Sequence, residues 1–244
     1  MEKLTGFLAS LLLFPLFLPA QTTTAADTAT YLADIKDELM TVWPDSRTIN
    51  LVFHGHSVPA GYWHNHEVHT LESYPNIVLR KLKAQYPYAV INVIVTAIGG
   101  ENSVKGQERF TRDVLSHRPD ILFIDYALND RSVGLEQARE AWEKMIQAAL
   151  EQNIKIILLT PSPDQRLDIL EPENPLALHA DQIKELARQY HTGLADPFTQ
   201  FQQIAASDEA LSDYMSHVNH PNEKGHEIIV EEIIKWLKPL SKTK

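Results

Sequence analysis

Short apolar segments rich in β-branched residues alternate along the chain with longer stretches in which apolar side chains recur at helical spacing. Segments that are apolar on both faces are typical of strands buried between helices. Such strands are predicted at residues 49–53, 90–95, 121–124, 154–159 and, more weakly, 192–195. The helical stretches are residues 74–85, 106–115, 135–152, 176–190 and 223–237.

This alternation predicts an α/β fold. Strands joined by right-handed helical crossovers form a parallel sheet with helices on both faces. No internal repeat or linker interrupts the pattern, so we expect residues 27–244 to form one domain, a three-layer α/β/α sandwich around a five-stranded parallel sheet. Reactive groups in such sheets gather beyond the carboxyl ends of the strands, which directs attention to the segments that follow them.

The N-terminal segment has a different pattern. Residues 4–18 are almost entirely apolar, are interrupted by Pro15, and are followed by small residues. A basic start, an apolar run of about 7–15 residues and a small-residue exit are typical of a secretory signal peptide, and the run is shorter than the ~20 residues that span a bilayer. We expect residues 1–26 to be a signal peptide cleaved at Ala20 or Ala26, and the mature chain to be secreted or periplasmic without stable membrane insertion.

Charge and composition exclude several functions. The formal net charge is −10, from 32 acidic and 22 basic residues, and no basic cluster is visible, so nucleic acid is not an expected partner. There is no cysteine, which excludes disulfides, cysteine-ligated zinc, iron–sulfur clusters, a thiol nucleophile and a cysteine-linked lipid anchor.

The segments after the predicted strands carry the residues of an acyl-transfer site. Ser57 follows the first strand in the sequence Gly-His-Ser, Gly100 follows the second and Asn129 follows the third. His220 stands before the last predicted helix. A serine, a glycine whose backbone N–H is accessible, an amide donor and a histidine can together supply a nucleophile, a base and an oxyanion site.

These blocks resemble those of the SGNH (GDSL-type) hydrolases and span most of the chain. The family's nucleophile block matches residues 55–57, its second-block glycine matches Gly100, its Gly-x-Asn-Asp block matches residues 127–130, and its Asp-x-x-His-Pro block matches residues 217–221. The resemblance implies a flavodoxin-like sandwich and serine esterase activity that needs no cofactor. It also implies the roles of the matching residues: Ser57 as nucleophile, His220 as base, and an oxyanion hole formed by Ser57, Gly100 and Asn129.

The chain departs from the family pattern at three positions. His56 replaces an aspartate whose role in the family is mainly local hydrogen bonding, and Ala127 replaces a glycine. More seriously, His217 stands where the family has the acid that orients the catalytic histidine. Three alternatives remain: a serine–histidine dyad whose ring is oriented by a backbone carbonyl or His217, a carboxylate from elsewhere with Asp213 nearest in sequence, or an impaired hydrolase.

A cluster of histidines suggests metal binding as a rival hypothesis. Imidazole and carboxylate groups can bind zinc, and the cluster comprises His54, His56, His64, His66 and His69. However, two of these belong to the nucleophile turn, and the rest fall in a loop without a helical His-Glu-x-x-His motif. We therefore expect no catalytic metal.

Other residues are candidates for the substrate cleft. His56 is one candidate, and Tyr62 and Trp63, which follow the nucleophile turn, are two others. The aromatic faces of Tyr62 and Trp63 either line the cleft beside a sugar ring or cover the core. Arg131 and Arg166 either place positive charge near the site or are solvated loop arginines. The loop at residues 161–175 is proline-rich and acidic, and is a candidate wall or lid of the cleft.

The hypothesis that accounts for most of these features is a secreted serine esterase acting on short-chain or acetyl esters, either small molecules or esters on carbohydrates. One alternative is a lipase or lysophospholipase of the same fold. The other is a catalytically impaired carbohydrate-binding module.

Overall fold

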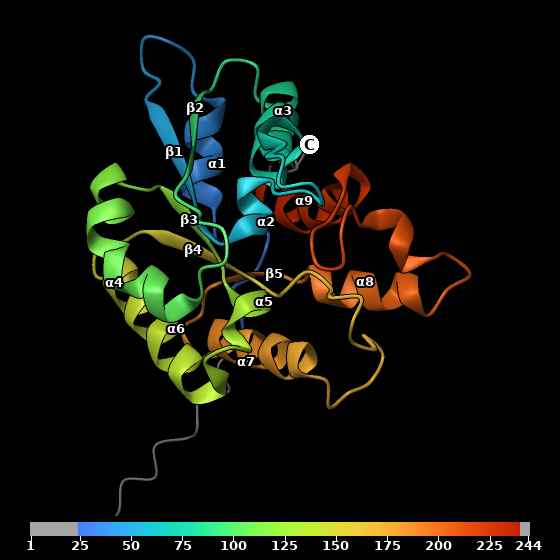
Figure 1. The fold of residues 1–244 in the computed structure, drawn as a ribbon. Coiled ribbons are helices and arrows are strands. Elements are labelled where there is room, and N and C mark those ends of the chain that lie inside the picture. The colour runs from blue at the N-terminus through green and yellow to red at the C-terminus, as the bar shows by residue number, and fades with distance from the viewer. Residues whose placement is uncertain (1–23, 240–244) are drawn as a thin grey trace, which may run out of the picture.

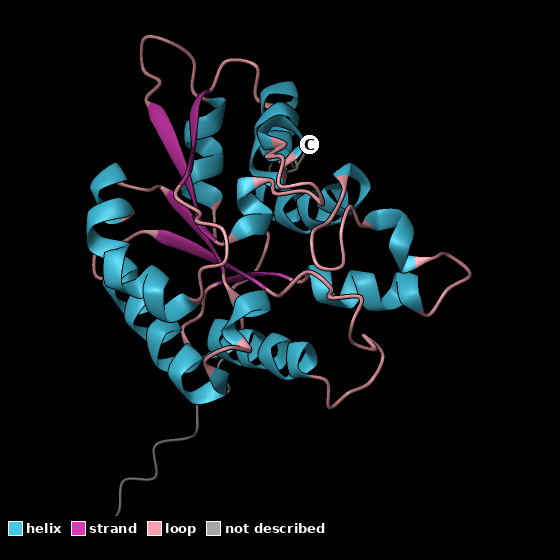
Figure 2. Ribbon diagram, viewed as in Figure 1, coloured by secondary structure: helices cyan, strands magenta, loops and turns pink. Residues whose placement is uncertain are grey.

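Five parallel strands form the sheet of the computed structural model, which describes residues 24–239. The strand order is β2-β1-β3-β4-β5 (Figures 1 and 2). The strands are β1 (Thr48–Gly55), β2 (Val90–Val95), β3 (Ile121–Asp125), β4 (Lys155–Leu159) and β5 (Gly193–Ala195). The sandwich around a five-stranded parallel sheet is therefore confirmed.

The long helices also lie where the sequence predicts them. They are α3 (Tyr74–Gln85), α4 (Ser103–Asp113), α6 (Gly134–Leu150), α7 (Pro175–Gln189) and α9 (Glu223–Leu237). The largest difference is at α4, which begins three residues earlier than expected because the Asn102 side chain accepts a hydrogen bond from the Lys105 N–H and caps the helix.

Some helical segments were not expected. They are α1 (Ala33–Met40), α2 (Ser57–Ala60), α5 (Ala127–Asp130), α8 (Pro197–Ala205) and the 3₁₀ turns η1 (Thr70–Glu72), η2 (Leu115–His117) and η3 (Leu211–Tyr214). Most are too short to show a helical period. The longer α8 begins with an Asp196 cap and Pro197, which is a helix-start signal that the apolar pattern alone does not reveal.

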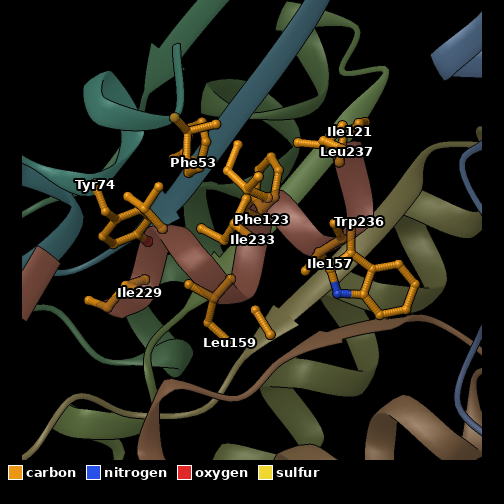
Figure 3. Close-up of a cluster of buried hydrophobic side chains, with 14 of the residues drawn as sticks. Phe53, Tyr74, Ile121, Phe123, Ile157, Leu159, Ile229, Ile233, Trp236 and Leu237 are labelled. Carbon is orange, nitrogen blue, oxygen red and sulfur yellow. The ribbon is translucent and has the colours of Figure 1, made fainter. Parts of the chain in front are cut away.

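Alternate residues of the strands face two separate apolar cores. Phe53 and Phe123 are fully buried on one face, where their rings stack at 4.3 Å, and Ile229, Ile233 and Trp236 of α9 pack into the same core. Figure 3 shows these side chains between α9 and the sheet. The second core lies on the other face and contains side chains of α4, α6 and the C-terminal half of α7. This period of two explains why the strands read as continuous apolar runs.

The strand order creates a switch point at the middle of the sheet. The chain passes from β1 to β2 on one side and then returns to β3 on the other side of β1. Crevices of α/β sheets form where the strand order reverses in this way, at the carboxyl ends of the strands. The short helices α2 and α5 follow β1 and β3 directly at this point (Figure 1).

The expected signal peptide lies almost entirely outside the described residues. At its end, the Thr24 carbonyl accepts a hydrogen bond from the His191 ring, and the Ala26 N–H donates to the Thr192 carbonyl. Within residues 24–239 no helix is long and apolar enough to cross a membrane.

Candidate active site

Ser57 is the first residue of α2, directly beyond the end of β1. The turn is tight, because a Cβ on Gly55 would lie 2.5 Å from the Asp125 carbonyl oxygen. His56 caps α2 by accepting the Val58 N–H at its Nδ1 atom (3.2 Å), and Gly61 ends it with a left-handed φ of 89°. The geometry places Ser57 at a helix N-terminus, beyond the carboxyl ends of the strands.

Ser57 and His220 contact each other beyond the carboxyl ends of the strands. The Ser57 Oγ atom lies 2.9 Å from the His220 Nε2 atom, within hydrogen-bonding distance. His220 belongs to a loop at residues 215–221 whose ends pair through an antiparallel bridge between Met215 and Pro221. The sequence expectation that these two side chains come together therefore agrees with the structure.

Candidate hydrogen-bond donors follow the ends of β1, β2 and β3. Within the described part of the chain, no acceptor is found for the backbone N–H groups of Ser57 and Gly100. Gly100 has a φ of 77°, and open space surrounds the position its Cβ would take. The Asn129 Nδ2 atom donates one hydrogen bond to the Glu101 carbonyl at 2.9 Å, which orients the amide and leaves its second N–H available.

The ring of His220 has a partner on one side only. Its Nδ1 atom is buried and has no hydrogen-bond partner among the described residues. The His217 ring is 5.8 Å away, centroid to centroid, and neither His217 nor Asp213 hydrogen bonds with the His220 ring. Both side chains are exposed. The structure therefore brings Ser57 and His220 together without an orienting acid.

The chain matches one known family over most of its length. A model of the GDSL-like lipase/acylhydrolase family matches residues 53–228, which is well over half of the chain. The chain belongs to this family.

Solved structures share the fold at low sequence identity. A two-domain esterase described as active on acetylated mannans superposes with a TM-score of 0.72 at 20% identity, covering 91% of this chain and 56% of its own. An acetylxylan esterase from Geobacillus stearothermophilus superposes with a TM-score of 0.67 at 19% identity, covering 78% of this chain and 94% of its own. This chain thus spans little more than half of the two-domain esterase. No curated protein matches it.

The environment of His220 keeps this GDSL-like hydrolase's imidazole neutral. Burial lowers the pKa of His220 to about 4, and the neighbouring His56 and His217 contribute to the shift. A neutral imidazole can accept a proton from Ser57 at its Nε2 atom only when the ring proton is on Nδ1. That tautomer leaves the Nδ1–H group without an acceptor in this structure.

A buried chain of polar groups lies behind the nucleophile turn. The His56 Nε2 atom is 3.3 Å from Asp125 Oδ1, and the Tyr74 hydroxyl donates to Asp125 Oδ2 at 3.1 Å. Burial and the Asp125 carboxylate raise the pKa of Tyr74 well above its ordinary value. His56 makes the local hydrogen bond expected of it. No motif in the sequence indicates its contact with Asp125 or the contact of Asp125 with Tyr74.

A second buried network fixes the segment that contains Gly100. The Glu101 carboxylate accepts hydrogen bonds from the Tyr126 hydroxyl (2.7 Å) and from the Arg109 Nε atom (2.9 Å). The His54 Nε2 atom lies 3.1 Å from the same hydroxyl, and its Nδ1 atom lies 2.9 Å from Thr96 Oγ1. Since the Glu101 carbonyl holds the Asn129 amide, this network positions two of the candidate donors.

Asp130 anchors the next segment. Its carboxylate is fully buried and accepts hydrogen bonds from the Ser103 N–H and the Trp142 Nε1–H, both at 2.7 Å. Burial raises the pKa of Asp130, and these donors oppose that rise. Asp130 therefore ties the α5 turn, and Asn129 with it, to α4 and α6.

The two aromatic candidates lie differently. Tyr62 is half-buried, its ring centroid is 6.4 Å from that of His220, and a Cβ on Gly99 would lie 3.0 Å from its ring. Trp63 instead stacks on the His69 ring at 4.0 Å. Neither ring belongs to the two apolar cores. Tyr62 thus borders the Ser57–His220 pair.

The remaining histidines of the cluster do not converge. His54 and His56 are buried at hydrogen-bonding positions, whereas His64 and His66 are exposed. Within residues 24–239, no group of three histidine, aspartate or glutamate side chains is placed to hold a metal ion.

Arg131 and Arg166 are ion-paired rather than freely solvated. Both guanidinium groups contact the buried Asp164 carboxylate, at 2.7 Å and 2.6 Å respectively. Although burial opposes the charged form, these contacts lower the pKa of Asp164 to about 2. The sequence marks the two arginines as candidates, but no motif in it indicates Asp164 as their shared partner.

Proposed function

We propose that this hydrolase is a secreted carbohydrate esterase that removes acetyl or other short acyl groups, with Ser57 as nucleophile and His220 as base. The observation that carries the proposal is the 2.9 Å contact between Ser57 Oγ and His220 Nε2. The backbone N–H groups of Ser57 and Gly100, which have no acceptor among the described residues, support it. Two of the similar solved structures are catalytic mutants of the acetylxylan esterase in which a serine or a histidine is replaced by alanine. That supports a serine–histidine pair here.

The reaction proceeds in two halves. Ser57 Oγ attacks the acyl carbonyl carbon while its proton moves to His220 Nε2, and the resulting oxyanion accepts hydrogen bonds from the N–H groups of Ser57, Gly100 and Asn129. The tetrahedral intermediate expels the sugar alkoxide, which takes the proton from His220. Water, deprotonated by His220, then attacks the acyl-enzyme and releases the carboxylic acid and free Ser57.

The pair works as a dyad in this proposal. In a serine protease triad, replacement of the acid costs about 10⁴ in kcat, yet substantial catalysis remains from the oxyanion hole and binding. Here burial keeps His220 unprotonated at neutral pH, so the base is available. Because no carboxylate contacts the Nδ1 atom among the described residues, the imidazolium is stabilised less than in a triad. We therefore expect a modest kcat.

Carbohydrate esters are the proposed substrates for two reasons. The two structural neighbours are described as active on acetylated mannans and as an acetylxylan esterase. In this chain, Tyr62 presents an aromatic ring beside His220, and such rings suit the apolar face of a sugar.

Release of acetate tests the proposal. The purified protein is incubated with p-nitrophenyl acetate, acetylated xylan and acetylated mannan, in parallel with the Ser57→Ala and His220→Ala variants. Each substitution is expected to lower turnover by about 10³-fold or more. Ser116→Ala, which removes an exposed hydroxyl bonded to the Arg112 carbonyl, is the control and should keep wild-type activity. Equal rates for wild type and Ser57→Ala would exclude an esterase and leave a non-catalytic binding module.

The same assay with longer acyl chains separates this function from a lipase. A short-chain esterase loses activity steadily from acetate to octanoate esters, whereas a lipase or lysophospholipase gains it. Preference for the octanoate ester would contradict the proposed substrate class while leaving the roles of Ser57 and His220 in place.

We propose that secretion involves cleavage at Ala20. The apolar run at residues 4–18 supports a signal peptide. Cleavage at Ala20 retains the contacts of Thr24 and Ala26 with residues 191–192, whereas cleavage at Ala26 removes both contacts. Mass spectrometry of the secreted protein tests this, and a mature chain that begins at residue 27 would contradict it.

A further inference from the structure

The missing orienting acid raises the question of what holds the ring of His220 in place. The backbone N–H groups of Ser216 and His217 both donate to the His220 carbonyl, at 2.9 Å and 3.2 Å, and the Ser216 hydroxyl donates to it at 3.1 Å. These contacts close the loop at residues 215–221 on the residue that carries the ring. They leave the loop to be fixed against the rest of the molecule by other contacts.

Gln165 makes such contacts. Its backbone N–H donates to the Val218 carbonyl at 2.7 Å, and its side-chain Nε2 donates to the His217 carbonyl at 3.2 Å. Both acceptors lie in the stretch that leads to His220. One residue of the segment between β4 and α7 thus holds two successive carbonyls of the loop.

Asp164 anchors Gln165 to the candidate oxyanion site. Its fully buried carboxylate binds the Arg131 guanidinium at 2.7 Å, and the Arg131 Nε atom donates to the Leu128 carbonyl at 2.9 Å. Leu128 directly precedes Asn129. Hydrogen bonds therefore connect the segment of Asn129, through Arg131, to Asp164. The next residue along the chain, Gln165, is hydrogen-bonded to the loop of His220.

We propose that Asp164 and Gln165 are positioning residues that orient His220 through the backbone of its loop, in place of a carboxylate on the ring. The inference rests on the proposed roles of Ser57 and His220. Asp164 is fully buried and its low pKa keeps it charged at neutral pH, so the link to Arg131 persists under assay conditions. Neither residue hydrogen bonds with Ser57 or the His220 ring, so both act through the loop.

The first test removes the side-chain donor of Gln165. Gln165→Met keeps the length of the side chain but cannot donate to the His217 carbonyl, and kcat is expected to fall about threefold to tenfold, the usual worth of one hydrogen bond, with KM little changed. Gln165→Lys restores a donor and should recover most of the loss. Rates are expressed per Ser57 titrated with a fluorophosphonate, so that misfolded protein does not count.

The control removes a similar hydrogen bond elsewhere in the same segment. The Gln202 Nε2 atom donates to the Ile169 carbonyl at 3.1 Å, so Gln202→Met tests whether general loosening of the segment lowers kcat. It should leave kcat unchanged. An equal fall in Gln202→Met and Gln165→Met would overturn the inference, as would an unchanged kcat in Gln165→Met.

The second test removes the charge of Asp164. Asp164→Asn weakens the contact with Arg131 and is expected to lower kcat about tenfold or more. Asp168→Asn is its control, since the Asp168 carboxylate accepts the Leu170 N–H at 2.9 Å in the same segment without contacting the His220 loop. If Asp164→Asn unfolds, the Gln165 variants still decide. Failure of the proposed function gives a different result: the wild type and Ser57→Ala would then have equal turnover.

Discussion

His56 shows how a substitution at one residue is accommodated by residues distant in sequence. The family has an acid at this position, and the chain has an imidazole that still accepts the Val58 N–H. The acid is not lost from the region, because the Asp125 carboxylate at the end of β3 lies 3.3 Å from the His56 ring. The buried site thus holds one imidazole and one carboxylate, a pairing that reduces the penalty of burial.

Restoring the family residue should therefore harm this protein. His56→Asp would place two carboxylates in a buried site, and like charges in such a site repel each other. We expect a loss of about 3 kcal/mol in the free energy of unfolding, measured with urea. The double variant with Asp125→Asn should recover most of that loss. An unchanged stability in His56→Asp would show that the pair carries no charge-dependent role.

The opposite outcome is expected at His217. His217→Asp would put a carboxylate three residues before His220, where it can stabilise the imidazolium that forms in the proposed attack by Ser57. We expect kcat to rise about tenfold or more, and the acid limb of the pH–rate profile to move to higher pH because the carboxylate raises the pKa of His220. His217→Asn has the same shape without charge and is the control. Equal activities of the two variants would contradict the electrostatic explanation.

These residues also mark what the sequence could and could not reveal. The order of Ser57, Gly100, Asn129 and His220 along the chain was sufficient to predict that a serine meets a histidine. The unpartnered Nδ1 atom and the roles of Asp125 and Asp164 were not predictable, because each depends on side chains from separate strand ends. A local motif does not specify which distant carboxylate fills a buried site.

At the scale of elements, the apolar pattern predicted every strand and every long helix. It missed α1, α2, α5 and α8, because a helix of one or two turns gives too few apolar repeats to establish a period. Two of these short helices matter most for the site, since α2 begins at Ser57 and α5 contains Asn129. The candidate site is thus formed by elements that hydrophobic periodicity detects least well.

Close packing of α4 on the end of β3 gives a prediction at this scale. The Cβ of an alanine at Gly106 would overlap the ring of Tyr126, whose hydroxyl is held by Glu101 and His54. Gly106→Ala is expected to lower the free energy of unfolding by about 2 kcal/mol through overpacking. It should also lower kcat, because displacement of Glu101 disturbs the carbonyl that holds Asn129.

Thermal unfolding and kcat, measured together, check this prediction. Lys105→Ala, an exposed substitution on the same helix, should change neither quantity. If Gly106→Ala lowered stability alone, the network of Glu101 and Tyr126 would be structural support without influence on the candidate oxyanion site.

At the scale of the whole molecule, a fully buried histidine stands on each side of the sheet. His54 contacts Phe110 and Tyr126 on the α4 side, and His226 of α9 accepts the Tyr74 N–H at 3.3 Å on the other side. Burial lowers the pKa of each to about 3, with a smaller contribution from Arg109 at His54 and from His220 at His226. Both layers of the sandwich therefore depend on an uncharged imidazole.

This dependence predicts loss of stability in acid. Below about pH 6.5 the unfolded chain binds protons at these histidines while the folded chain does not, so the free energy of unfolding falls with decreasing pH. The expected slope is about 1.4 kcal/mol per pH unit for each histidine until the pH approaches its folded pKa. Urea unfolding between neutral pH and about pH 4.5 measures it. His226→Asn keeps an acceptor for Tyr74 without a titrating ring and should show a shallower slope; parallel slopes would contradict the assignment.

Catalysis and stability should consequently fail at different pH values. The proposed base His220 stays neutral down to about pH 4, because a half-buried ring among other imidazoles resists protonation. Initial values of kcat/KM, measured within seconds of transfer to acid, should be nearly constant to about pH 5 and then fall as His220 becomes protonated. After long incubation the activity should disappear at a higher pH, since protons that bind the unfolded chain at His54 and His226 draw the protein out of the folded state. If kcat/KM in the rapid assay fell to half its maximum at a pH near the ordinary histidine pKa, burial would not be lowering the pKa of His220. Identical rapid and long-incubation profiles would show that protonation of the base, rather than unfolding, limits the enzyme in acid.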